Sequence, residues 1–269
     1  MAKVLSEKEL KKKAQLEEVF RTGNQDMFSH YRRLFGLLPS DPRCVTCMAP
    51  FEGVGGTLVR NILHIKRSTF NPLMCDQCEQ ELRELEYGTE TEMTMLFADI
   101  RGSTTLAESM TATAFKNLID RFYSETSHIL VHSYAIIDKI RGDEINGYYL
   151  PTFVGSDFAE RAVKAAKDLL AVTGHNDPEG PWVPVGVGIH TGVAYYGAVT
   201  SSDGLVELTA LGDAVNTASR LASKAEAGEI ILSGETAEKA GVKTSTLEKR
   251  SLELKGKAAP MDAWVMHLS

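Results

Sequence analysis

DKIRGDEINGYYLP, residues 138–151, contains two β-prone runs on either side of a tight turn. Residues 134–140 and 145–150 are rich in apolar and aromatic side chains, and only Arg141-Gly142-Asp143-Glu144 separates them. A separation of this length is typical of a β-hairpin, whose two strands pair in antiparallel fashion. The stretch therefore predicts an antiparallel pair with an acidic residue, Asp143, in its turn.

Strand-like and helix-like segments alternate on both sides of this hairpin. Before it, residues 93–98 predict a strand and residues 112–131 predict a long amphipathic helix. After it we expect a helix at 157–173, two strands at 183–191 and 193–199 joined at Gly192, a helix at 214–224, and strands at 229–232, 246–254 and 262–268. This order indicates an α+β sandwich with a mostly antiparallel sheet and flanking helices.

Composition excludes several classes of protein. The 269 residues are 43% hydrophobic and 24% charged, which suits a packed globular chain. The net charge of −7 argues against a general nucleic-acid binder, because phosphate binding needs basic clusters. No apolar stretch approaches the roughly 20 residues that span a bilayer, and the N-terminus is too charged for a signal peptide. We expect a cytoplasmic protein without membrane insertion.

The first third of the chain differs in character from the rest. Residues 6–22 predict a helix, with Ser6 and Glu9 placed as a capping box, and residues 25–38 predict a second short helix. We expect three parts: a helical segment over 1–43, a small cysteine-containing module with a linker helix over 44–88, and the main domain over 89–269. Residues 44–78 of the module predict a loop-rich structure, because they include Gly53, Gly55 and Gly56.

All four cysteines lie in that small module, as two Cys-x-x-Cys pairs: Cys44, Cys47, Cys75 and Cys78. Four thiolates in two such pairs suit one structural Zn²⁺ in a closed tetrahedral site. An iron–sulfur cluster is the alternative, because four cysteines can also hold one. Four buried cysteines without any ligand are a third possibility.

Two aspartates follow apolar strands and precede tight turns. Asp99 lies in LFADIRGS, residues 96–103, and Asp143 lies in the hairpin turn. A carboxylate at a strand end can bind a hard cation together with phosphate oxygens, and two such carboxylates can hold two Mg²⁺ ions. Alternatively, each aspartate caps the turn that follows it.

A third segment, residues 208–221, reads LTALGDAVNTASRL. Asn216 and Arg220 are four residues apart and so share one face of the predicted helix. An amide and a guanidinium side by side suit recognition of ribose and phosphate, because the planar guanidinium donates two parallel hydrogen bonds. Pairing of Arg220 with a surface acid is the alternative.

Together these segments resemble the class III adenylyl and guanylyl cyclase catalytic domain. The resemblance covers residues 91–268, and it rests on five motifs in the family's order: FADIRGST (97–104), DKIRGDEINGYYLP (138–151), VPVGVGIHTGVAYYG (183–197), LTALGDAVNTASRL (208–221) and LELKGKAAP (252–260). It implies a ferredoxin-like cyclase sandwich.

The resemblance also implies roles for single residues. Asp99 and Asp143 match the metal-binding aspartates, with the backbone carbonyl of Ile100 as a further ligand, for two Mg²⁺ or Mn²⁺ ions per active site. Lys139 and Thr209 match the pair that reads the purine, and this pair favours ATP over GTP.

On the substrate's sugar and phosphates, Asn216 matches the residue that orients the ribose, and Arg220 the residue that stabilises the pentavalent phosphorus. Lys255 or Lys257 matches a lysine that binds the terminal phosphates. In this family the two sets of residues come from different subunits, so the resemblance implies a homodimer with two active sites at its interface.

The activity implied is that of an adenylate cyclase, a phosphorus–oxygen lyase that converts ATP to 3′,5′-cyclic AMP and pyrophosphate. A guanylate cyclase is one alternative. A diguanylate cyclase is another, because Arg141-Gly142-Asp143-Glu144-Ile145 is similar to the signature of those enzymes. We expect residues 1–88 to regulate activity through a ligand or a protein partner; as an alternative, they form a zinc-dependent module that only docks the enzyme.

Overall fold

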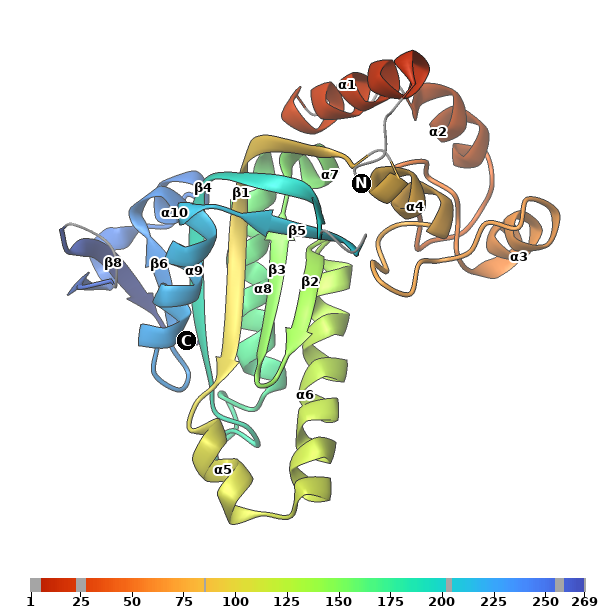
Figure 1. Ribbon diagram of the computed structural model, residues 1–269. Coiled ribbons are helices and arrows are strands. Elements are labelled where there is room, and N and C mark those ends of the chain that lie inside the picture. Colours follow the sequence, from red (N-terminus) through yellow and green to blue (C-terminus); the bar gives the residue numbers. More distant parts are fainter. Residues whose placement is uncertain (1–5, 23–27, 85, 202–204, 255–258, 269) are drawn as a thin grey trace. The chain divides into compact units, whose positions relative to one another are not determined.

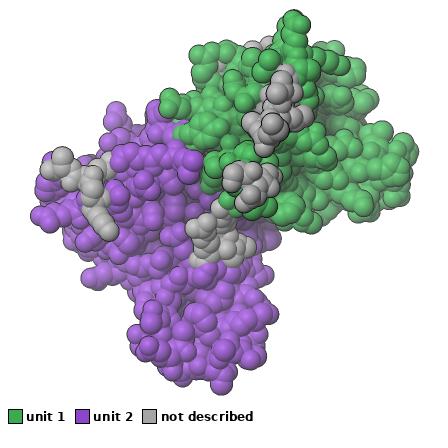
Figure 2. Space-filling model, viewed as in Figure 1, with its two compact units in different colours: residues 1–91, 150–155, 195–210 green, residues 92–149, 156–194, 211–269 purple. Residues whose placement is uncertain are grey.

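The computed structural model describes residues 6–22, 28–84, 86–201, 205–254 and 259–268. The chain forms two compact units, which Figure 2 shows in different colours. The first unit comprises residues 1–91, 150–155 and 195–210, and the second comprises residues 92–149, 156–194 and 211–269. The predicted three-part division at residues 43/44 and 88/89 stays a prediction.

Strands from across the chain form one sheet with the order β2-β3-β1-β4-β6-β8-β7, and β5 pairs with β4. Their bounds are β1 Gly88–Ile100, β2 Ile136–Arg141, β3 Glu144–Tyr149, β4 Val185–Thr200, β5 Val206–Leu211, β6 Ile230–Ser233, β7 Glu248–Leu252 and β8 Met261–Met266. The β2–β3, β1–β3, β6–β8 and β7–β8 pairs are antiparallel, and β4–β6 is parallel. The predicted α+β fold with a mostly antiparallel sheet is confirmed.

Helices cover both faces of the sheet in the second unit (Figure 1). On one face, α6 (Ala112–His132) and α10 (Gly234–Lys239) both pack against α8 (Phe158–Val172). On the other face lies α9 (Asp213–Lys224), while the short α5 (Ser103–Ser109) follows the end of β1. Residues 93–98 of β1 are all buried, as expected for a strand that is covered on both faces.

The strand β4 corrects one prediction. Gly192 was expected to join two separate strands, yet β4 runs without interruption from Val185 to Thr200. A Cβ atom at Gly192 would lie 3.0 Å from the Cβ of Ala214 and 3.1 Å from Nε2 of His190. Gly192 therefore allows α9 to pack closely on an extended strand, and it does not form a turn.

In the first unit, α1 (Glu7–Thr22), α2 (Ser29–Gly36), α3 (Gly53–Ile62), α4 (Asp76–Glu84) and α7 (Pro151–Val154) are the α-helices among the described residues. The predicted capping box is confirmed: the Ser6 N–H donates to the Glu9 carboxylate at 2.8 Å, and the Glu9 N–H donates to Ser6 Oγ at 3.3 Å. The sequence predicted loops where α3 lies, because Gly53, Gly55 and Gly56 disfavour a helix.

Phe20 fixes α1 to residues that are remote in sequence. Its ring lies 4.4 Å from that of Tyr87, 5.3 Å from that of Phe153 and 6.1 Å from that of Tyr196, measured between centroids. The hydroxyl of Thr152 donates to the Phe20 carbonyl at 2.9 Å. Because all these aromatic side chains are large, their contact anchors the last turns of α1 by apolar burial.

The packing of α9 on β4 leads to a test of stability. A Cβ atom at Gly188 would lie 2.0 Å from the backbone nitrogen of Ala222 and 2.7 Å from the carbonyl oxygen of Ala218. These backbone atoms can move away only if the whole helix shifts. Gly188→Ala should therefore lower the free energy of unfolding by about 2–3 kcal/mol, measured by urea denaturation. Gly36→Ala is the control, because open space surrounds that position. Equal stability of the two variants would contradict this account of the packing.

Candidate functional site

Two aspartates lie on adjacent segments at the rim of the sheet in the second unit. Asp99 is the penultimate residue of β1 and lies opposite Glu144 in the β1–β3 register. Asp143 occupies the turn between β2 and β3 and precedes Glu144 directly. The backbone N–H of Ile100 donates to the carbonyl oxygen of Asp143 at 3.0 Å, so the two segments are in direct contact. The antiparallel pairing thus brings together the two aspartates that the sequence singled out.

Electrostatics at this rim suit a divalent cation. Burial raises the pKa of Asp99, Arg101 opposes that rise, and the negative charge of Asp143 adds to it. A carboxylate whose ionisation is disfavoured by burial and by a neighbouring negative charge gains from a cation beside it, and carboxylate oxygens are the ligands that Mg²⁺ and Mn²⁺ prefer. The residues present therefore fit the metals that the sequence predicted.

Arg101 is a residue to which the sequence argument gave no role. Its guanidinium forms an ion pair with the Asp99 carboxylate and donates to the Asp99 carbonyl at 3.3 Å. It also donates to the carbonyls of Ser223 and Ala225 at 3.4 Å each, at the end of α9. Arg101 therefore connects the carboxylate to a second element. Its position two residues after Asp99 was the only available signal.

Tyr123 is a second residue that the sequence argument missed. From α6, its hydroxyl donates to the carbonyl of Gly142, the residue before Asp143. Gly142 has φ of 59°, a left-handed conformation that glycine adopts without strain. Burial and then Asp143 raise the pKa of Tyr123. The hydroxyl thus positions the turn, but no local pattern links residues this far apart in sequence.

The helix α9 presents Asn216 and Arg220 outward. Its buried residues are Ala214, Thr217, Ala218, Leu221 and Ala222, mostly small side chains that allow close approach to the sheet. Asn216 is exposed and Arg220 is partly exposed. Among the described residues no acid forms an ion pair with Arg220, and no hydrogen bond or ion pair joins Asn216 or Arg220 to Asp99 or Asp143. The surface-acid pairing considered for Arg220 is thus not observed.

The remaining predicted substrate residues are only partly described. Thr209 is half-buried on β5, in the first unit. Lys139 lies in β2 where the register with β3 shifts, between Ile137 and Ile140, and its side chain is outside the description. Lys255 and Lys257 also lie outside the described residues.

The four cysteines converge in the first unit. Their sulfur atoms all lie within 4.8 Å of one another, and the Sγ atoms of Cys47 and Cys75 are 3.8 Å apart. Four sulfurs that surround one Zn²⁺ at ~2.3 Å would be about 3.8 Å apart, which is the separation of the Cys47 and Cys75 sulfurs. The N–H groups of Cys75 and Cys78 donate to the sulfurs of Cys44 and Cys75 at 3.3 and 3.4 Å. The pairs thus come together as predicted.

Positive charge accompanies this cluster. The guanidinium of Arg32 on α2 donates to the carbonyls of Val45 and Thr46 at 3.0 and 3.1 Å, within the first Cys-x-x-Cys pair. Burial lowers the pKa of Arg32, while Cys44 and Cys47 oppose that shift. Hydrogen bonds from the Cys47, Cys75 and Cys78 thiols lower the pKa of Cys44. Hydrogen bonding with Cys44 instead raises the pKa of Cys75 and of Cys78, so the metal-free cluster favours thiolate, the form that binds metals, at Cys44.

Comparison with known proteins agrees with this geometry. Residues 85–267 match the family described as the adenylate and guanylate cyclase catalytic domain. An adenylate cyclase of Mycobacterium tuberculosis is 30% identical over 179 residues, which are 65% of this chain and 39% of that protein. Guanylyl cyclase C of Sus scrofa is 31% identical over 153 residues, which are 54% of this chain and 14% of that protein.

A solved structure gives the same result. The crystal structure of the adenylyl cyclase CyaB from P. aeruginosa superimposes with a TM-score of 0.59 and 27% identity, covering 68% of this chain and 97% of that one. The chain spans less than half the length of the two curated relatives above. No helix among the described residues has both the length and the apolar character needed to cross a membrane.

The charges around Asp99 give a prediction about its titration. Arg101→Gln should raise the pKa of Asp99 further, because it removes the cation that stabilises the carboxylate. Asp143→Asn should lower it, because it removes the nearby negative charge. Carboxyl ¹³C NMR titration of the metal-free protein measures both shifts. Arg121→Gln is the control, since Arg121 stacks 3.9 Å above the Trp182 ring instead. Shifts of the opposite sign would contradict the arrangement.

Proposed function

Because this chain belongs to the adenylate and guanylate cyclase catalytic domain family, we propose that it converts ATP to 3′,5′-cyclic AMP and pyrophosphate. The observation that carries the proposal is the contact between the end of β1 and the β2–β3 turn, which brings Asp99 beside Asp143. The proposal extends to the metals, the choice of purine and the assembly.

Asp99, Asp143 and the carbonyl of Ile100 would hold two Mg²⁺ or Mn²⁺ ions. When bound, these ions supply activation of the attacking ribose 3′-oxygen and neutralisation of the leaving pyrophosphate. Arg101 holds the Asp99 carboxylate through its ion pair, and Tyr123 holds the turn before Asp143 through Gly142. Both contacts restrict where the carboxylates can lie, as a metal site requires.

The protein's own side chains, in addition to the metal ions, would recognise the nucleotide. A Lys139 ammonium can donate to adenine N1, and a Thr209 hydroxyl can accept from the 6-amino group. Guanine presents the reverse pattern at these atoms, so the pair favours ATP. Asn216 would orient the ribose, and Lys255 or Lys257 would bind the terminal phosphates. Arg220, which has no acidic partner among the described residues, is available to stabilise the charge on the transferring phosphorus.

We propose a homodimer with two active sites, each built from both copies. The exposed position of Asn216 and the partly exposed position of Arg220 on α9 support this assembly, because both side chains can reach a second copy. One copy would provide Asp99 and Asp143, and the other would provide the α9 side chains. Two equivalent sites related by a two-fold axis follow from such an arrangement.

Product identification tests the choice of substrate. Purified protein is incubated with ATP or GTP in the presence of Mg²⁺ or Mn²⁺, and mass spectrometry identifies the products. Cyclic AMP from ATP supports the proposal. Cyclic GMP as the main product would favour the guanylate cyclase alternative, and cyclic di-GMP would favour the diguanylate cyclase alternative.

Mixed dimers test the shared site. Asp99→Asn and Arg220→Ala should each reduce turnover by at least about a hundredfold, because each removes a group that stabilises charge in the transition state. After equal amounts exchange subunits, activity should recover to about one quarter of wild type, since half the dimers then contain one intact site of two.

The matched control for the mixed dimers uses two variants of one helix. A mixture of Asn216→Ala and Arg220→Ala should show no recovery of activity. The same copy supplies both residues to a given site, so no mixed dimer contains an intact site. A mixture of Asp99→Asn and Arg220→Ala that forms mixed dimers yet stays inactive would refute the shared site.

For the cysteine cluster we propose one structural Zn²⁺. The sulfur geometry and the buried positions of Cys44, Cys47 and Cys75 support a closed site with four protein ligands. Elemental analysis should find one zinc per chain. Visible absorbance with a brown colour, and no stoichiometric zinc, would favour the iron–sulfur alternative.

We also propose that the N-terminal residues regulate turnover through α4. This helix carries Cys78 and, one turn later, Arg83, whose guanidinium donates to the carboxylate of buried Glu79 at 2.8 and 3.0 Å. Arg83 also donates to the carbonyl of Val206 in β5, the strand that contains Thr209. The cysteine cluster is thus connected to the strand of a proposed purine-reading residue through one helix and one guanidinium.

A double-mutant cycle tests this connection. Cys44→Ser/Cys47→Ser and Arg83→Gln should each change the specific activity by about fivefold or more. Their combination should change it no further than the larger single effect, because both changes break the same connection. Dimerisation is checked by gel filtration for every variant.

Arg60→Gln is the control for the cycle, because Arg60 is exposed on α3 in the same unit. Unchanged activity in the cysteine variant with dimerisation intact would favour the alternative in which this module only docks the enzyme to a partner.

A further inference from the structure

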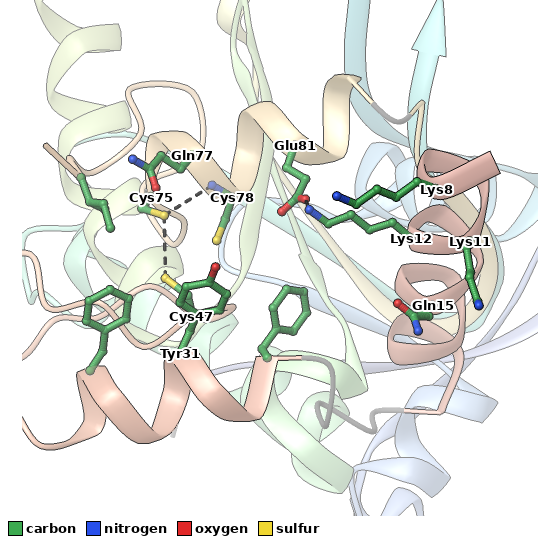
Figure 3. A pocket seen from close by; sticks show the side chains of 13 residues that line it. Lys8, Lys11, Lys12, Gln15, Tyr31, Cys47, Cys75, Gln77, Cys78 and Glu81 are labelled. Atoms are coloured by element: carbon green, nitrogen blue, oxygen red, sulfur yellow. Dashed lines mark hydrogen bonds and ion pairs between the residues drawn. The ribbon is translucent and has the colours of Figure 1, made fainter. Parts of the chain in front are cut away.

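A cavity of about 500 Å³ lies within the first unit, between α1, α2 and the cysteine cluster (Figure 3). This volume falls within the roughly 300–1,000 Å³ typical of sites for small organic molecules. Neither the aspartate pair nor α9 contributes to its lining, so the cavity is separate from the proposed catalytic residues. Its walls differ in chemistry, and they indicate what would bind there.

One wall is aromatic and belongs to α2. Tyr31 and Phe35 stack with their ring centroids 6.4 Å apart and an angle of 19° between the ring planes. Phe35 is buried, whereas Tyr31 is 55% exposed despite its size. Phe28 and Ile65 extend this apolar surface within the cavity. A flat apolar body would cover the exposed ring and gain from stacking on it.

The opposite wall is cationic and belongs to α1. Lys11 and Lys12 follow Lys8 by three and four residues, so both lie on the helix face next to Lys8. Lys12 forms an ion pair with Glu81 of α4, which neutralises both charges. Within the described residues Lys8 and Lys11 form no ion pair. Figure 3 shows the lysines on the side of the cavity away from the cysteines.

The floor of the cavity touches the proposed zinc site. Cys47, Cys75 and Cys78 all line it, and Gln77 and Gln15 add hydrogen-bonding groups. A molecule in the cavity would therefore contact the aromatic wall, the lysines and the edge of the cysteine cluster together. Two ammonium groups that have no ion pair within the described part of the chain, opposite an exposed aromatic ring, select for negative charge on a flat apolar body.

We propose that this cavity binds an organic anion with a flat apolar body and a carboxylate or sulfonate group. The site lies in the N-terminal residues, and binding there does not depend on the proposed cyclase activity. The opposite end of α1 packs through Phe20 on Tyr87, Phe153 and Tyr196, so the helix that carries the lysines is anchored at its other end.

The test uses 8-anilinonaphthalene-1-sulfonate, an anion with a flat naphthalene ring and a sulfonate group, which fluoresces when it leaves water. Titration of the full chain should show saturable binding of one molecule per chain. Lys8→Glu/Lys11→Glu should weaken it by about tenfold or more, because two attractive charges become repulsive. Tyr31→Ala should also weaken it, through loss of the stacking surface. Sodium chloride should weaken binding to the wild-type protein.

Lys13→Glu is the matched control, because Lys13 lies on the same helix but outside the cavity lining. It should bind as the wild type does. Circular dichroism confirms that each variant is folded, and the cyclase assay is recorded separately. Absence of saturable binding, or equal affinity in the Lys8→Glu/Lys11→Glu and Lys13→Glu variants, would overturn the proposal. Either result leaves the proposed catalytic activity untouched, since that activity is measured by its own products.

Discussion

The hydrogen bond from the Ile100 N–H to the Asp143 carbonyl closes the end of the β1–β3 ladder, and the candidate site depends on it. Antiparallel pairing places residues from distant parts of the chain opposite one another, here Asp99 opposite Glu144. Backbone pairing therefore places the two aspartates on neighbouring segments, without any attraction between their side chains. The surroundings then offset the cost of placing two negative groups together: Arg101 pairs with Asp99, and Tyr123 holds the turn.

Local patterns in the sequence predicted the parts of the site that are local in space. The hairpin around Asp143, the strand that ends near Asp99 and the helix with Asn216 and Arg220 follow from periodicity and turn length. Arg101 and Tyr123 could not be assigned in this way, because their roles depend on contacts with Ala225 and Gly142 that only the folded chain creates.

Glycine explains where the sequence argument was wrong. A glycine in a strand indicates either a bend or a close neighbour, and the residue itself does not say which. At Gly192 the neighbour is Ala214, so the strand continues. In α3, Gly55 and Gly56 fit against the carbonyl oxygens of Pro39 and Phe51, and a helix forms despite its poor intrinsic propensity. Tertiary packing decided both cases.

The division of the chain into units has a consequence for protein engineering. Residues 195–210 lie within the part of the sequence that matches the cyclase family, yet they pack with the N-terminal residues in space. The Arg83 guanidinium donates to the carbonyl of Val206, and the backbone N–H of Ala198 donates to the carbonyl of Tyr87. A chimaera joined at residue 89, as a motif alignment would suggest, therefore separates these residues from their native partners. A graft that keeps α4 and Tyr87 with the catalytic segment preserves them.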